Sequence, residues 1–161
     1  VGSEMCIRDR LYKELMIKIP SKVKYFSYAG IIPIIIGLIG SFDLNFISNN
    51  INDLLIEFGV LFSAAILSFL GGGLFILETH YKSEIDFKGL FISMCPSIWA
   101  VLSLLLPMTC FLLAIGFLAT LERERSLSKA KIISFPNWWF KLRFQLTTAM
   151  IILLVILGFN V

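Results

Sequence analysis

Charged residues are scarce in this sequence. Only 16% of the chain is charged, whereas 58% is hydrophobic and the mean hydropathy is +0.88. A soluble domain has about 25% charged residues and about 45–50% apolar ones. This shortage excludes an ordinary soluble domain, and no basic stripe stands apart from the hydrophobic segments to bind nucleic acid. We therefore predict an all-α integral membrane protein whose first partner is the lipid bilayer.

Groups that carry chemistry are equally scarce. The single histidine, His80, has two glutamates nearby, but one histidine in a predicted solvated loop is weak support for a metal site. The sequence contains no Walker, Rossmann, His-Glu-x-x-His or Ser-x-x-Lys signature. Cys95 and Cys110 lie inside apolar segments, where cysteines are more typical packing residues than a disulfide or metal pair. We predict no enzyme, no catalytic residue, no cofactor and no metal.

The first residues are set aside from the fold. Residues 4–10, "EMCIRDR", resemble the translation of a transposase adapter used in DNA sequencing libraries. Such stretches are excluded from fold reasoning, so residues 1–15 are treated as a sequencing scar with an uncertain start. Met16 is the expected native start, and it precedes a short basic entry to the first hydrophobic segment. Residues 16–161 are predicted to form a single membrane domain.

Hydrophobic residues are concentrated in five segments that we interpret as transmembrane helices. A bilayer core of about 30 Å needs about 20 helical residues. The fourth segment is the shortest, because its 14 residues rise only about 21 Å. It either extends through Glu122 and Arg123 or forms a hairpin with the third segment around Pro107, without a full crossing. The segments cover about residues 25–42, 54–77, 89–106, 108–121 and 144–159.

Basic residues lie on alternate connections between these segments. Twelve of the 14 lysines and arginines precede the first segment or lie between segments two and three or four and five. The remaining connections and the last residues contain none outside the adapter-like stretch. This pattern predicts a topology with the N-terminus on the cytoplasmic side and the C-terminus outside. The frequent use of Ile, Phe, Asn and Lys is typical of AT-rich genes, and together with the adapter-like stretch it suggests an uncultured bacterium. We therefore place the protein in a bacterial cytoplasmic (inner) membrane. The twelve are Lys13, Lys18, Lys22, Lys24, Lys82, Lys88, Arg123, Arg125, Lys129, Lys131, Lys141 and Arg143.

Small residues spaced four apart predict close helix contacts. Such rows share one helix face and let two backbones approach in lipid. Three consecutive glycines exceed what close packing needs, so a flexible site, or one that a ligand approaches, is the alternative at residues 71–73. The first segment carries one row, Pro33, Gly37 and Ser41, and the second carries Ala64, Ser68 and Gly72, widened by Gly71 and followed by Gly73. Gly59 and Ser63 begin a similar row in the second segment, one turn earlier. We predict that these two rows pack against each other.

Aromatic and basic residues are interleaved just before the fifth segment, in "FPNWWFKLRF". Trp138, Trp139, Lys141 and Arg143 are predicted to anchor the chain at the membrane interface. Cations there attract anionic lipid at the cytoplasmic face. Specific recognition of a lipid or a partner protein is the alternative interpretation.

Glu57 is the ionisable residue that lies nearest to the middle of a predicted span. It follows the start of the second segment by about one turn, where an acid complements the helix dipole. A role in binding a cation or a proton is the alternative, since ionisable groups are costly inside a membrane.

The chain resembles the domain of unknown function 3429 family, which includes transmembrane protein 69. The resemblance covers roughly residues 28–157 and depends on "YAGIIPII", "AILSFLGG", "PSIWAVLSLLLP", "LAIGF" and "PNWWFKLRFQLT", in that order. It implies a five-span bundle in bacterial inner membranes or mitochondria, without an established activity. The family tends toward a His-Trp-Gly run after the glycine pair, where this chain has Leu74, Phe75 and Ile76.

Two functional hypotheses follow. The first is a non-catalytic protein that acts through helix packing and contact with lipid, a membrane-protein partner or a second copy, in the assembly or maintenance of a membrane complex. The second is a small oligomeric transporter or channel lined by the glycine segment. The odd number of spans and the absence of an internal repeat make the second hypothesis weaker.

Overall fold

A computed structural model describes residues 19–42, 48–80, 87–129 and 135–161. The adapter-like stretch, Met16, Lys82 and Lys131 lie outside the described residues. Within those ranges the chain is all-helical and has no strand, as the sequence predicts. The helices are α2 (Ser21–Ala29), α3 (Ile32–Gly40), α4 (Asn49–His80), α5 (Phe87–Leu105), α6 (Thr109–Lys129) and α7 (Trp139–Asn160).

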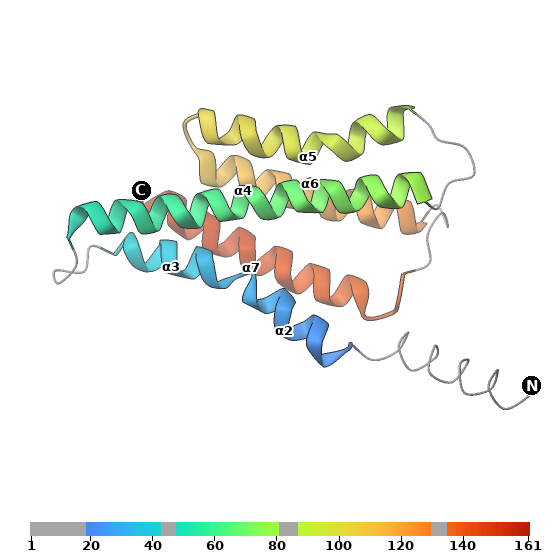
Figure 1. Cartoon of the computed structure of the whole chain (residues 1–161), viewed down its shortest axis with the longest axis horizontal. Helices are drawn as coiled ribbons and strands as arrows, with labels where there is room; N and C mark the ends of the chain where they lie inside the picture. Colours follow the sequence, from blue (N-terminus) through green and yellow to red (C-terminus); the bar gives the residue numbers. More distant parts are fainter. Residues whose placement is uncertain (1–18, 43–47, 81–86, 130–134) are drawn as a thin grey trace, which may run out of the picture.

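Consecutive long helices run in opposite directions (Figure 1). The start of α2, the end of α4, the start of α5, the end of α6 and the start of α7 lie at one end of the bundle. We call this the basic end, because it holds the described lysines Lys22, Lys24, Lys88, Lys129 and Lys141. The C-terminus lies at the opposite end, with the start of α4 and the turn between α5 and α6. The helix directions alternate as the basic pattern predicts.

The first predicted span consists of two helices. A turn at Gly30 and Ile31 separates α2 from α3, and Pro33 lies in the first turn of α3, where its missing N–H needs no helical partner. Helix α2 diverges from α4 beyond this turn (Figure 1). Helix α3 instead packs tightly on α4, since a Cβ on Gly37 would lie 3.1 Å from the Gly59 Cα. The turn therefore leaves α2 with few contacts to the rest of the bundle.

Among the residues that the structure describes, four helical stretches are long and apolar enough to cross a membrane, by length and composition. They are Ser21–Gly40, Asn49–His80, Phe87–Leu105 and Trp139–Asn160. Helix α6 is not among them, although its 21 residues rise about 31 Å. Five of its last eight residues are charged, so α6 fails as a candidate span because of its low hydropathy and not because of its length. The fourth segment is thus longer than the 14 residues that the sequence predicts, and its helix runs through Glu122 and Arg123 as one alternative proposed.

The expected break at Pro107 is present: α5 ends at Leu105 and α6 begins at Thr109, with Met108 at a φ of 66° between them. Cys110, which follows this turn, is buried, whereas Cys95 is exposed. Small residues let the helices approach around a set of almost fully buried side chains, namely Ile34, Leu67, Leu113, Phe117, Leu154 and Leu157.

Candidate functional site

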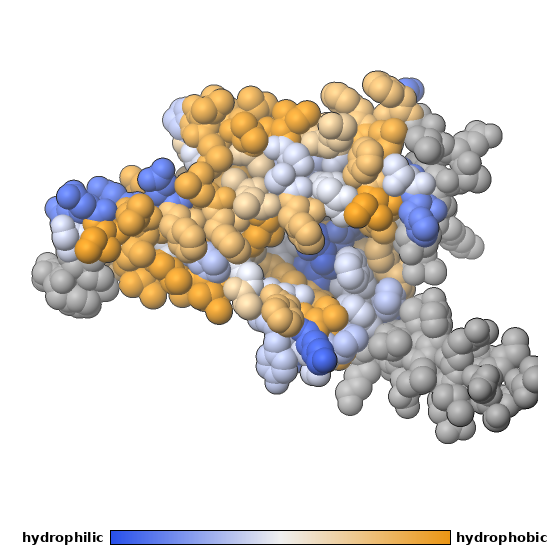
Figure 2. Space-filling model, in the orientation of Figure 1, coloured by the Kyte–Doolittle hydropathy of each residue, from blue (hydrophilic) through white to orange (hydrophobic). Residues whose placement is uncertain are grey.

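An open groove lies between α2, α4 and α7. It consists of two adjoining cavities of about 550 and 190 Å³. Figure 2 shows a hollow between α4 and α2 with hydrophilic residues at its floor and hydrophobic residues along part of its margin. The groove exists because α2, which precedes the turn at Gly30 and Ile31, points away from α4. The residues that line both cavities are Ser27, Phe69, Leu70, Arg143 and Leu146.

The walls of the groove are mainly apolar. Helix α4 contributes Phe69, which is 78% exposed, together with Leu70 and the Gly73 backbone. Helix α7 contributes Leu146, and α2 contributes Val23. Ligand pockets commonly have volumes of about 300–1,000 Å³ and apolar walls with a few polar groups, and this groove has the same character.

A buried ion pair lines the groove near the basic end. Arg143 on α7 donates from Nε to Glu124 Oε2 at 3.0 Å and from Nη2 to Glu124 Oε1 at 2.5 Å. The two side chains are 12% and 5% exposed. Trp139 Nε1 also donates to Glu124 Oε2, at 3.4 Å. The Glu124 carboxylate on α6 is therefore neutralised and held by two groups of α7, which offsets the cost of its burial.

A second ion pair joins α4 to α6 at the same end. Arg123 donates to Glu78, whose side chain is 2% exposed. The sequence does not predict either pair, because Glu78 and Glu124 lie just outside the predicted spans 54–77 and 108–121. One signal was available: Leu113, Phe117, Glu124 and Leu127 follow helical spacing, and the structure buries all four.

The three consecutive glycines have three different environments. A Cβ on Gly71 would lie 3.0 Å from Ser97 Oγ and 3.2 Å from Pro96 Cβ, so Gly71 allows α5 to approach α4. No described atom lies within 4 Å of a Cβ built on Gly72 or Gly73. Gly73 lines the groove, and Gly72 does not. The structure offers no account of Gly72.

The predicted contact between small residues of the first span and small residues of α4 is present, but it lies at Gly59 and not on the Ala64 row. Helix α3 meets α4 through Gly37 and Gly59, one turn or more before the Ala64 row. Ala64 is buried in the core, and Ser68 accepts a hydrogen bond through its carbonyl from Ser97 Oγ at 3.2 Å. The reason is geometric: α3 ends the first span and reaches only the first half of α4 (Figure 1).

Of the residues predicted to anchor the chain at the membrane interface, some are exposed and others contact residues inside the bundle. Lys141 is exposed, and Trp138 is half-buried and lines the groove. Arg143 and Trp139 point at Glu124 instead of outward. Trp139 also stacks on Phe135, with ring centroids 5.5 Å apart. Interleaved cations and aromatics in the sequence do not reveal which of them have a partner on another helix.

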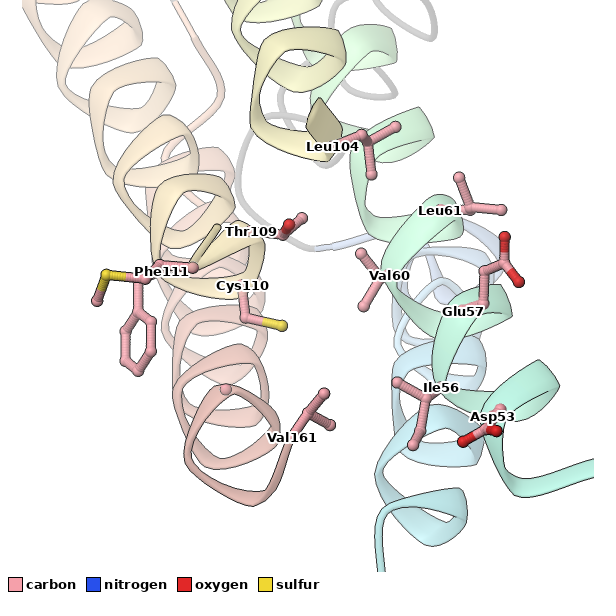
Figure 3. A pocket seen from close by; sticks show the side chains of 12 residues that line it. Asp53, Ile56, Glu57, Val60, Leu61, Leu104, Thr109, Cys110, Phe111 and Val161 are labelled. Atoms are coloured by element: carbon pink, nitrogen blue, oxygen red, sulfur yellow. The ribbon is translucent and has the colours of Figure 1, made fainter. Parts of the chain in front are cut away.

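Glu57 lies far from the groove, at the opposite end of the bundle. It lines a separate cavity of about 620 Å³ with Asp53 on α4, across from Cys110 and Phe111 on α6 (Figure 3). Both acids are exposed. The described residues contain no group of three or more His, Cys, Asp or Glu side chains placed to hold a metal ion.

The four apolar helical stretches in the described part of the chain define it, by length and composition, as a multi-pass helical membrane protein. The chain belongs to the family described as "Protein of unknown function (DUF3429)", whose family model matches residues 19–159. The matched range contains every residue of the groove and of both ion pairs. Comparison with curated proteins gave no match, and comparison with solved structures gave none.

Proposed function

We propose that this is a non-catalytic membrane protein that acts through contact with lipid and with neighbouring membrane proteins, in the assembly or maintenance of a membrane complex. The observation that carries the proposal is the open groove between α2, α4 and α7. Its place is a bacterial cytoplasmic membrane, with the basic end on the cytoplasmic side as the positive-inside rule requires.

Gly73 supports lipid contact at this groove. Glycine in a helix interior costs roughly 1 kcal/mol relative to alanine, and no described atom approaches Gly73 closely enough to offset that cost. An acyl chain lying in the groove would pack against the bare α4 backbone at this position. Gly71, in contrast, already has α5 as its neighbour.

The ion pairs support a non-catalytic role. A general acid or base needs a titratable group that is available to a substrate. Glu124 lines the groove, but Arg143 and Trp139 already bind its carboxylate. These contacts suit a structural role that holds α6 and α7 together beneath the groove.

The experiment is lipid retention by the purified full chain in mild detergent, measured by native mass spectrometry. We expect at least one phospholipid to stay bound, and Gly73→Leu to lose it because leucine fills the groove. Gly72→Leu is the matched control, since it adds the same side chain at the next exposed position outside the groove. Bound lipid should be recovered chemically unchanged. Equal retention by both variants, or recovery of a lipid product, would contradict the proposal.

A transporter or channel is the second candidate, and the cavity at the opposite end favours it. That cavity of about 620 Å³ carries Asp53 and Glu57, which would attract a cation. The nearly inaccessible side chains Leu113 and Phe117 belong to the core between the two ends. Cation flux into liposomes that Glu57→Gln abolishes would establish this candidate, whereas the leading proposal predicts no flux above protein-free liposomes.

A further inference from the structure

The groove has unused hydrogen-bond donors in an otherwise apolar setting. Arg143 bonds to Glu124 through Nε and Nη2, and its Nη1 donates to no described residue. Ser27 Oγ likewise donates to no residue in the described part of the chain. Both residues line both cavities of the groove. Two donors facing an apolar groove call for a ligand that brings acceptor oxygens and hydrocarbon together.

Apolar residues continue from these donors along the groove. Phe69, Leu70 and Leu146 lie beside the donors, and Ile66 and Met150 extend the lining away from the basic end. The aromatic residues Trp138 and Trp139 lie on the other side, toward that end. Apolar side chains therefore lie on both sides of the two donors, which leaves room for a hydrocarbon chain beside them.

Excess positive charge lies at the basic end of the bundle, next in sequence to the groove residues Val23 and Leu142. Lys22 and Lys24 on α2 and Lys141 on α7 are exposed and make no ion pair with any residue that the structure describes. The buried carboxylates Glu78 and Glu124 at this end are each paired with an arginine. Each cation near an anionic surface contributes about 1 kcal/mol to binding.

We propose that the groove between α2, α4 and α7 is a binding site for one anionic phospholipid. Its phosphate or ester oxygens accept hydrogen bonds from Ser27 Oγ and Arg143 Nη1, and one acyl chain lies along Phe69 and Leu146. Lys24 and Lys141 attract the headgroup charge. The inference rests on the proposed function, to which it adds the chemical class of the lipid and the orientation in which it binds.

The test offers the purified full chain an equimolar mixture of phosphatidylglycerol and phosphatidylcholine with identical acyl chains. Native mass spectrometry then gives the ratio of the two bound species. We expect phosphatidylglycerol to dominate about 25-fold, because two cations near the headgroup contribute about fivefold each. Lys24→Gln and Lys141→Gln should each lower that preference by about fivefold, as the loss of one cation near the headgroup implies. Both lysines are exposed, so neither substitution should affect folding.

A second pair of variants tests the hydrogen bonds and the acyl chain. Ser27→Ala should weaken retention of both lipids, since both present ester and phosphate oxygens, and Gly73→Leu should abolish retention of both. Gly72→Leu should change neither. Inorganic phosphate added in excess should not displace the lipid, because the acyl chain supplies much of the binding energy.

The outcomes separate this inference from the proposed function. Equal retention of the two lipids, with loss in Gly73→Leu, would overturn the anionic preference and leave the lipid groove standing. Displacement of the lipid by inorganic phosphate would overturn the assignment of a phospholipid as the ligand and would indicate a simple anion site. Retention that Gly73→Leu does not lower would overturn both proposals. A bound species that is not a phospholipid would overturn the inference outright.

Discussion

The two sides of α4 use the same residue type for opposite purposes. Gly71 faces α5, where a Cβ would lie 3.0 Å from Ser97 Oγ, and Gly73 faces the open groove with no described atom within 4 Å. One glycine closes an interface and the other leaves a surface accessible, although only one residue separates them. The role of a small residue in a transmembrane helix therefore depends on whether another helix packs against it.

The largest expected loss of stability comes from breaking the ion pair between Arg143 and Glu124. Arg143→Ala leaves the Glu124 carboxylate buried without its arginine, and removing one partner of a buried pair costs about 3–5 kcal/mol. Unfolding of the purified protein by sodium dodecyl sulfate, followed by circular dichroism, measures the loss. Glu122→Ala is the control, because its 3.9 Å contact with Arg125 is exposed and contributes less than about 1 kcal/mol. Equal effects of the two substitutions would contradict the buried pair.

The closed side of α4 carries the next effect. Gly71→Leu forces a side chain into the contact with Pro96 and Ser97, and overpacking of this kind costs about 1–3 kcal/mol. Gly73→Leu meets open space and should raise the free energy of unfolding by up to about 1 kcal/mol, because leucine is a better helix former than glycine. The same titration compares them. If Gly73→Leu were the more destabilising, the assignment of the two faces would be reversed.

A hydrogen bond on the closed side carries the smallest effect. Ser97 Oγ donates to the Ser68 carbonyl at 3.2 Å, and Ser97→Ala removes this contact between α5 and α4. Hydrogen bonds between membrane helices average about 0.6 kcal/mol. The difference lies close to the limit of a detergent unfolding titration, so replicate titrations are needed. A stabilisation on removing the hydroxyl would exclude a favourable contribution from this bond.

Much of the fold follows from local sequence patterns. Long apolar runs specify the helices, Pro107 marks the turn between α5 and α6, and alternate basic connections match the observed helix directions. Small residues also predict a close contact between the first span and α4. The register of that contact was not predictable, because Gly37 could meet any small residue on α4 and tertiary packing selects Gly59.

The candidate site itself was largely hidden in the sequence. Glu78 and Glu124 resemble ordinary charges at the ends of spans until α4 and α6 are seen to continue as helices past them. Arg143 was predicted to face the interface, because nothing local in the sequence reveals its partner 19 residues earlier. The groove depends on the turn at Gly30, which local glycine and proline content permits but does not require.

The most direct test is photolabelling in a phosphatidylcholine bilayer with a trace of phosphatidylglycerol that carries a photoreactive acyl chain. Lipid in the groove occupies one site, so its labelling should be saturable, whereas labelling by bulk lipid should not. The account predicts saturable labels near Ser27, Phe69 and Leu146, which excess unlabelled phosphatidylglycerol removes. Labels spread over exposed residues such as Phe91 and Leu105, with no saturable fraction in the groove, would contradict it.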